Sequence, residues 1–238
     1  MSAFLYGVAL QWKLDIRSKA LLITCYLVPL LFFAMMGSIF TALDQSAGET
    51  LIPSMTVMGV SMGALIGLPP SLAEIYGSDI RKVYKANGVP LYLGLFTTFL
   101  SSFLHLMIMS AIILCVAPIA FGASLPANLL QYFGALAIFI AVSLSVGCVL
   151  GLVVKNQAKL TMYAQVIFLP SIMLSGIMFP IGLLPKAFES VGKLFPATWG
   201  FKLMQDNGFL LSGLWPLLAV FLLAALLCGL LLNRLQSE

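Results

Sequence analysis

Long apolar runs separated by short polar segments dominate this chain of 238 residues. A helix needs about 20 mostly apolar residues to cross the hydrocarbon core of a bilayer. Six runs reach this length: residues 20–42, 53–73, 90–117, 128–154, 160–179 and 214–232. Charged residues make up only 8% of the chain, whereas a soluble domain is nearer to about a quarter charged. The pattern predicts an all-α integral membrane protein with six transmembrane helices in a single domain over residues 1–238.

The segment before the first run, residues 2–19, has the pattern of an amphipathic helix. Its apolar stripe is Leu5, Val8, Trp12 and Ile16. Its polar side chains fall elsewhere around the helix: Gln11, Lys13, Asp15 and Arg17. Such a helix is typical of the headgroup plane of a membrane. We therefore expect an N-terminal interfacial helix with Trp12 as its membrane anchor.

A polar segment at residues 74–89, between the second and third runs, has helical spacing of its own. Ser78 or Asp79 can cap its start, and Gly88 fits the left-handed position that ends a helix. Its apolar side chains share one face: Ile80, Val83 and Tyr84. Its charged side chains surround that face: Glu74, Asp79, Arg81, Lys82 and Lys85. The pattern is typical of a docking helix, and a solvated loop that happens to have helical spacing is an equal alternative.

The segment at residues 180–210, between the fifth and sixth runs, is apolar and divided by prolines. Pro185 can begin a short helix that Pro196 ends, and Thr198 can cap a second one. Irregular backbone is tolerated at membrane depth where protein surrounds it. We therefore predict a re-entrant helical hairpin in the outer leaflet, and the alternative is a surface loop lying on the lipid.

The distribution of basic residues indicates how the chain is oriented in the membrane. Lysine and arginine accumulate in cytoplasmic segments. They occur repeatedly in the alternate segments 2–19, 74–89 and 155–159. The connections at 43–52 and 118–127 have none, although a few lysines in 180–213 run against the bias. We predict a multi-pass protein of the plasma membrane with both termini in the cytoplasm.

Small residues recur every four positions in two of the predicted spans. The two stripes are Gly59, Gly63 and Gly67 in the second span, and Ser143, Gly147 and Gly151 in the fourth. Because such stripes let helix backbones approach closely, we assign them to helix packing. Residues 59–63 also match the GxSxG motif of serine hydrolases, whose serine sits on a strand-to-helix turn. An intramembrane serine hydrolase that uses Ser61 with His105 is therefore an alternative function.

Polar side chains inside the third and fifth spans are candidates for a translocation path. An ionisable residue within a membrane span is a functional candidate by default, and His105 shares a helix face with Thr98 and Ser101. The candidates in the fifth span are Thr161, Gln165 and Ser175. Hydrogen bonding to neighbouring helices is the alternative role. An ion-coupled carrier or channel is a further functional class, although the spans lack the paired carboxylates typical of such carriers.

Several chemistries are not supported by the sequence. The phosphate-binding motif GxxxxGK, followed by serine or threonine, does not occur, so we expect no ATP hydrolysis by this chain and assign no catalytic residue. The cysteines lie within apolar runs without the spacing of metal ligands or of a disulfide framework: Cys25, Cys115, Cys148 and Cys228. We expect no metal site, no cofactor on this chain and no nucleic-acid partner.

The order of these elements, together with two local patterns, resembles the permease subunit of type-2 ABC exporters. One pattern is Glu74 before the basic segment, followed by Asn87-Gly88-Val89-Pro90. The other is Ser175-Gly176 followed by Phe179-Pro180, Leu184-Pro185 and Phe195-Pro196. The resemblance covers essentially the whole chain.

This resemblance implies partners and a direction of transport. The permease would pair with a second copy or a paralogous permease in membrane lipid, and two copies of a cytoplasmic ABC ATPase, carrying ATP and Mg, would drive it. The helix in 74–89 would be the coupling helix, acting through Glu74, Asp79, Ile80, Arg81, Val83, Tyr84 and Lys85. The substrate would be hydrophobic or amphipathic, such as a drug, peptide, lipid or glycolipid, and would move outward across a bacterial cytoplasmic membrane.

Overall fold

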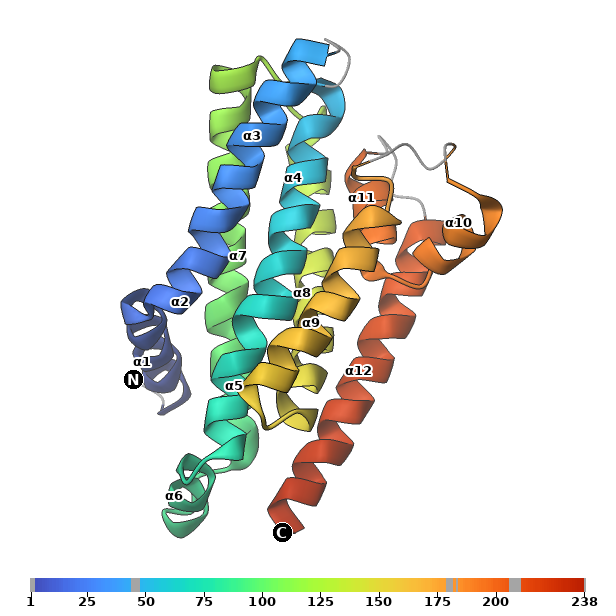
Figure 1. The fold of residues 1–238 in the computed structure, drawn as a ribbon. Helices are drawn as coiled ribbons and strands as arrows, with labels where there is room; N and C mark the ends of the chain where they lie inside the picture. Colours follow the sequence, from blue (N-terminus) through green and yellow to red (C-terminus); the bar gives the residue numbers. More distant parts are fainter. Residues whose placement is uncertain (1–2, 44–47, 179–181, 183, 206–210, 238) are drawn as a thin grey trace.

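Helices and the segments that connect them form the described structure (Figure 1). The computed structural model describes residues 3–43, 48–178, 182, 184–205 and 211–237. No strand occurs within these ranges, which confirms the all-α fold class. Some predicted features lie outside them: Met1 and Ser2, the Phe179-Pro180 pair, residues 181, 183 and 206–210 of the outer segment, and Glu238.

The helical elements follow one another along the chain with these bounds: α1 (Ala3–Arg17), α2 (Lys19–Leu22), η1 (Ile23–Leu27), α3 (Val28–Leu43), α4 (Gly48–Met62), η3 (Gly63–Gly67), α5 (Leu68–Gly77), α6 (Ile80–Ala86), α7 (Leu91–Phe121), α8 (Leu129–Val153), α9 (Gln157–Met173), α10 (Lys186–Gly192), α11 (Pro196–Gln205) and α12 (Leu211–Ser237). The elements η1 and η3 are π-helical turns.

Within the described residues, five helical segments are long and apolar enough to cross a membrane. They are Lys19–Ala42, Gly48–Gly77, Leu91–Phe121, Leu129–Val153 and Gly213–Gln236. Each overlaps one of the predicted spans. The chain is therefore a multi-pass membrane protein.

The fifth predicted span, residues 160–179, is shorter in the structure. Helix α9 has 17 residues and is about 25 Å long at 1.5 Å per residue, less than the about 30 Å of a hydrocarbon core. Beyond its last residue, Met173, the chain turns, and Gly176 has a φ of 88°. Only glycine adopts this conformation at little cost. The prediction of a helix that reaches residue 179 was therefore wrong.

The continuous rod of α4, η3 and α5 is the centre of the bundle. In its apolar stretch 83% of the residues are buried, compared with 17% in the span formed by α12. The rod contacts α3, α7, α8, α9 and α11, whereas α12 packs mainly on α8 and α11 at the periphery (Figure 1). Leucines of α12 consequently face outward, as a lipid-facing helix requires.

The two π-helical turns lie just before prolines and contact each other. Pro29 follows η1 and Pro69 follows η3, and a proline cannot donate the backbone hydrogen bond that a regular helix needs. A π turn is one way for a helix to accommodate that loss. The second span therefore accommodates Pro69 and Pro70 through a π turn that ends two residues before Pro69.

Helix α1 packs on α7, a contact that the sequence analysis did not predict. Asp15 is only 3% exposed and Trp12 is half-buried, whereas Leu5 and Ile16 are 54% and 46% exposed. Asp15, predicted among the polar side chains that lie away from the apolar stripe, is therefore buried against the bundle. The facing side of α7 presents hydroxyl and imidazole groups, so Asp15 finds a hydrogen-bond partner there, while Leu5 and Ile16 remain outside the contact.

Two short helices, α10 and α11, form the described part of the outer segment. Helix α10 follows Pro185 as predicted and exposes Phe188, while α11 is buried against α4, α8 and α12. Pro196 begins α11, and the Thr198 hydroxyl donates a hydrogen bond to the carbonyl of Gly192 at 2.6 Å. The prediction of Thr198 as the N-cap of the second helix was wrong, because its hydroxyl links the two helices instead.

Candidate functional site

Helix α6 projects from the end of the bundle that also carries the C-terminus (Figure 1). The Ser78 side chain accepts a hydrogen bond from the N–H of Ile80 at 3.2 Å. Asp79 makes no capping bond, and its carboxylate instead pairs with Lys82 at 2.8 Å, an interaction that lowers the pKa of Asp79. Of the two predicted capping side chains, the structure therefore uses Ser78.

The other end of α6 is closed around Gly88, whose φ is 65°. The N–H of Val89 donates to the carbonyl of Tyr84 at 2.8 Å, and the N–H of Gly88 donates to the carbonyl of Lys85 at 3.2 Å. This pair of bonds is the Schellman motif, which satisfies the last carbonyls of a helix. The helix therefore ends where the sequence predicted, and the chain enters α7 after Pro90.

The apolar residues of α6 differ in what they contact. Tyr84 is half-buried against the core, and a Cβ built on Gly94 of α7 would lie 3.3 Å from its ring. Ile80 and Val83 are 37% and 56% exposed. Tyr84 therefore joins α6 to the bundle, and Ile80 with Val83 forms the apolar surface that remains open to a partner.

The charged coupling candidates lie at the same end of the bundle. The ammonium group of Lys85 donates a hydrogen bond to the carbonyl of Gln236 on α12 at 3.0 Å. Glu74 is exposed near the end of α5, and Arg81 is half-buried on α6. The Lys85 bond therefore connects α6 to the last membrane-spanning helix.

His105 lies in a buried cluster between α7, α1 and the first span. Its ring stacks on Trp12, with centroids 4.0 Å apart and planes 10° from parallel. The Tyr26 hydroxyl and Nδ1 of His105 are 2.7 Å apart, and Nε2 has no hydrogen-bond partner among the described residues. Trp12, predicted as a membrane anchor, therefore also covers one side of the His105 ring.

Asp15 is a second ionisable residue of this cluster. Its carboxylate accepts hydrogen bonds from the Ser101 hydroxyl at 2.5 Å and from the Gln11 amide at 2.8 Å. Burial raises the pKa of Asp15, and those two bonds partly oppose the rise. Sequence reasoning found no acidic partner for His105, because Asp15 precedes the first span and reaches α7 only through the packing of α1.

The six translocation-path candidates are not gathered at one place. Thr98, Ser101 and His105 are buried on α7, and Ser101 faces α1. Thr161 and Gln165 are exposed on α9. The remaining candidate, at the end of α9, is Ser175, which is buried and donates to the carbonyl of Ile172 at 2.9 Å. Only the α9 pair therefore lies on a surface that could border a path.

The serine-hydrolase arrangement does not form among the described residues. Ser61 lines a small cavity of about 20 Å³ together with Ser143 and Ser171. His105 contacts Trp12 and Tyr26 instead, and no hydrogen bond joins it to Ser61 within the described part of the chain. A nucleophile and its base need to lie within hydrogen-bond reach, and this pair does not.

The glycines of both stripes lie at close contacts between helices. In the second span, a Cβ on Gly59 would lie 2.6 Å from Met109, one on Gly63 would overlap Leu106, and one on Gly67 would lie 2.8 Å from the Cys25 sulfur. In the fourth span, a Cβ on Gly147 would overlap the carbonyl oxygen of Ala64, and one on Gly151 would lie 2.8 Å from Leu72. These positions leave no room for a side chain unless neighbouring atoms move.

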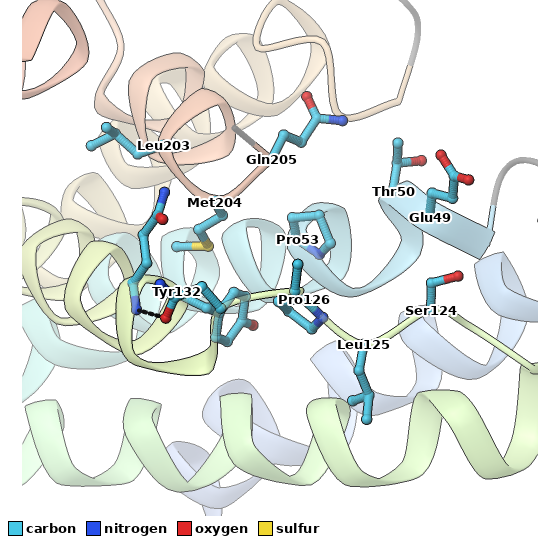
Figure 2. Close-up of a pocket in the computed structure, with 13 residues that line it drawn as sticks. Glu49, Thr50, Pro53, Ser124, Leu125, Pro126, Tyr132, Leu203, Met204 and Gln205 are labelled. Carbon is cyan, nitrogen blue, oxygen red and sulfur yellow. Dashed lines mark hydrogen bonds between the residues drawn. The ribbon is translucent and has the colours of Figure 1, made fainter. Parts of the chain in front are cut away.

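A pocket of about 420 Å³ lies at the opposite end from α6, where α4, α11 and the α7–α8 connection meet. Figure 2 shows Glu49 and Thr50 of α4 across from Ser124, with Gln205 of α11 nearby. Tyr132 lines the pocket, and its hydroxyl group lies 2.9 Å from the hydroxyl group of Thr56. Sequence reasoning missed this pocket, because its polar residues come from separate elements with no shared spacing.

A family comparison decides which class of protein carries these features. The model of the ABC-2 type transporter family matches residues 3–209, from the start of α1 to beyond the end of α11. The chain belongs to the ABC-2 type transporter family. No curated protein gives a match. The chain is therefore the permease subunit of a transporter and not an enzyme by itself, and permeases of this family generally work as dimers with ABC ATPase partners.

Proposed function

We propose that this permease is the membrane half of an ATP-driven exporter that moves an amphipathic or hydrophobic substrate out of the cell. Two ATPase copies would bind the α6 ends of two paired permeases, with both termini in the cytoplasm. The main support for this proposal is helix α6, which lies outside the apolar spans and keeps Ile80 and Val83 exposed. An exposed apolar pair on an otherwise charged helix suits a protein partner, because buried aliphatic anchors supply most interface energy.

Other features of the permease support the same reading. The exposed Thr161 and Gln165 side chains on α9 would face the path between two paired permeases. The pocket around Glu49 and Gln205 lies at the end opposite α6, and it would be the exit side of that path. The tight glycine contacts would hold the central rod and α8 together as the protomer moves.

Reconstitution in lipid vesicles tests the proposal. The permease is combined with candidate ABC ATPases from the same genome, and a panel of amphipathic fluorescent dyes reports transport. The expected result is transport that requires ATP, the ATPase and the permease together, with ATPase activity stimulated by the permease. Dye movement that persists without the ATPase, or that follows an imposed ion gradient instead of ATP, would support a carrier or channel.

A further inference from the structure

A groove of about 440 Å³ lies between α7, α8 and α12. It is lined by the first turns of α7 and the last turns of α12, so it lies in the half of the bundle nearest α6 (Figure 1). Its apolar walls include Leu95, Phe96 and Phe99 on one side and Phe221 and Leu232 on the other. Because Phe96 is 54% exposed, the groove opens toward the surroundings of the bundle.

The groove changes from apolar to polar along its length. The α12 wall is apolar from Phe221 to Leu232, a distance of about 16 Å at 1.5 Å per residue. It ends in the side-chain amides of Asn233 and Gln236. Lys85 adds a positive charge there, since its ammonium group lies 3.0 Å from the carbonyl oxygen of Gln236.

We propose that this groove binds an acyl chain of an anionic phospholipid, with the lipid phosphate beside Lys85. A phospholipid presents the same order of groups as the groove, from an apolar chain to polar esters and then a negative charge. An ammonium group has three N–H donors, so Lys85 can contact a phosphate while it keeps its bond to Gln236. Basic residues at the polar end of transmembrane helices recognise anionic headgroups in this way.

Gly229 provides a way to fill the groove without disturbing the fold. It lines the groove, and a Cβ built on it would meet no atom within 4 Å. Gly229→Phe should therefore occupy the space of the acyl chain. Gly229→Ala is the matched control, because it changes the same backbone position but leaves most of the groove open. Leu223→Phe is a second control, since Leu223 is 60% exposed on the same helix and does not line the groove.

Native mass spectrometry of the purified permease, without an ATPase, measures binding of phosphatidylglycerol and phosphatidylcholine. We expect one phosphatidylglycerol to bind to the unmodified protein. Gly229→Phe should lower the affinity for this lipid about tenfold or more, which corresponds to about two methylene groups that lose their apolar contacts. Both control variants should bind like the unmodified protein. Lys85→Gln should reduce the preference for phosphatidylglycerol over phosphatidylcholine about fivefold, the effect expected of one lysine near an anionic headgroup.

Equal phosphatidylglycerol binding by Gly229→Phe and the unmodified protein would overturn the proposal. So would loss of the dimer in Gly229→Phe without loss of lipid, because that result assigns the groove to a second copy of the chain. Transport is not measured in this experiment. A failure of lipid binding is therefore distinct from a failure of ATP-driven transport.

Discussion

The hydroxyl group of Ser101 on α7 donates a hydrogen bond to the carboxylate of Asp15 on α1, 86 residues earlier in the chain. Both side chains are buried, at 0% and 3% exposure. A buried carboxylate is costly unless hydrogen bonds compensate its lost hydration, and Gln11 supplies a second bond. The N-terminal helix, predicted to lie in the headgroup plane, is thus also joined to the bundle by a buried polar contact.

Removing this contact should loosen α1. We expect Asp15→Leu to destabilise the permease by about 1–3 kcal/mol, because Ser101 and Gln11 lose their buried acceptor. Asp15→Asn should cost less, since an amide oxygen can still accept a hydrogen bond. Thermal unfolding in mild detergent measures both variants, and Lys13→Ala on the exposed side of α1 is the control. Equal stability of Asp15→Leu and Lys13→Ala would contradict a stabilising role.

Asp15 should also make stability depend on pH. Because burial raises its pKa above the ordinary 3.8, the folded protein keeps the Asp15 proton at pH values where the unfolded chain has released it. The stabilisation from this group is therefore complete below about pH 4 and is lost as the pH rises through the raised pKa. The difference in melting temperature between the unmodified protein and Asp15→Asn, followed from pH 4 to pH 7, isolates this effect. Parallel profiles would show that Asp15 does not titrate as described.

The glycine contacts predict a sharp difference between two substitutions of the same kind. Gly147→Ala should destabilise the bundle by about 1–3 kcal/mol, because the new Cβ overlaps the backbone carbonyl of Ala64 and the helices must separate. Gly229→Ala should be neutral or slightly stabilising, since its Cβ enters open space and alanine favours a helix. Melting temperatures and the dimer fraction in detergent measure both variants. Similar losses in the two proteins would refute a packing role for Gly147.

The exposed pair on α6 should determine binding of the ATPase. Ile80→Ala and Val83→Ala should each weaken the ATPase complex about fivefold or more without changing the melting temperature of the permease. Lys82→Ala, at an exposed ion pair with Asp79, is the control and should have a much smaller effect. Tyr84→Ala should lower the melting temperature as well, because Tyr84 packs on the bundle. Titration of the ATPase onto immobilised permease measures affinity, and unchanged affinity in both aliphatic variants would exclude α6 as the docking helix.

Cysteine accessibility tests the proposed orientation. In a background without native cysteines, Ala86→Cys on α6 should react with a membrane-impermeant maleimide only in opened cells. Phe188→Cys, 52% exposed on α10, should react in intact cells. The two positions lie at opposite ends of the bundle (Figure 1). Labelling with the reverse pattern would place the termini outside the cytoplasm.

Local features of the sequence determined the helices and much of α6. Apolar runs of sufficient length predicted the spanning segments because a membrane span must satisfy its own backbone hydrogen bonds, and a helix does so within one segment. Gly88 ended α6 as predicted, because its left-handed conformation is a property of one residue and its neighbours. The family resemblance rested on the same local information and agrees with the family match over residues 3–209.

Only the tertiary structure decided which polar groups meet. Asp15, Trp12 and Tyr26 converge with Ser101 and His105 because α1 folds back onto α7, and no spacing within one helix encodes that approach. The same limit applies to the end pocket and the groove at Gly229, whose walls come from several elements. Periodicity records which side of a helix differs from the other. It does not record whether that side will face lipid or another helix, because this depends on which side chains the neighbouring helix presents on its facing surface.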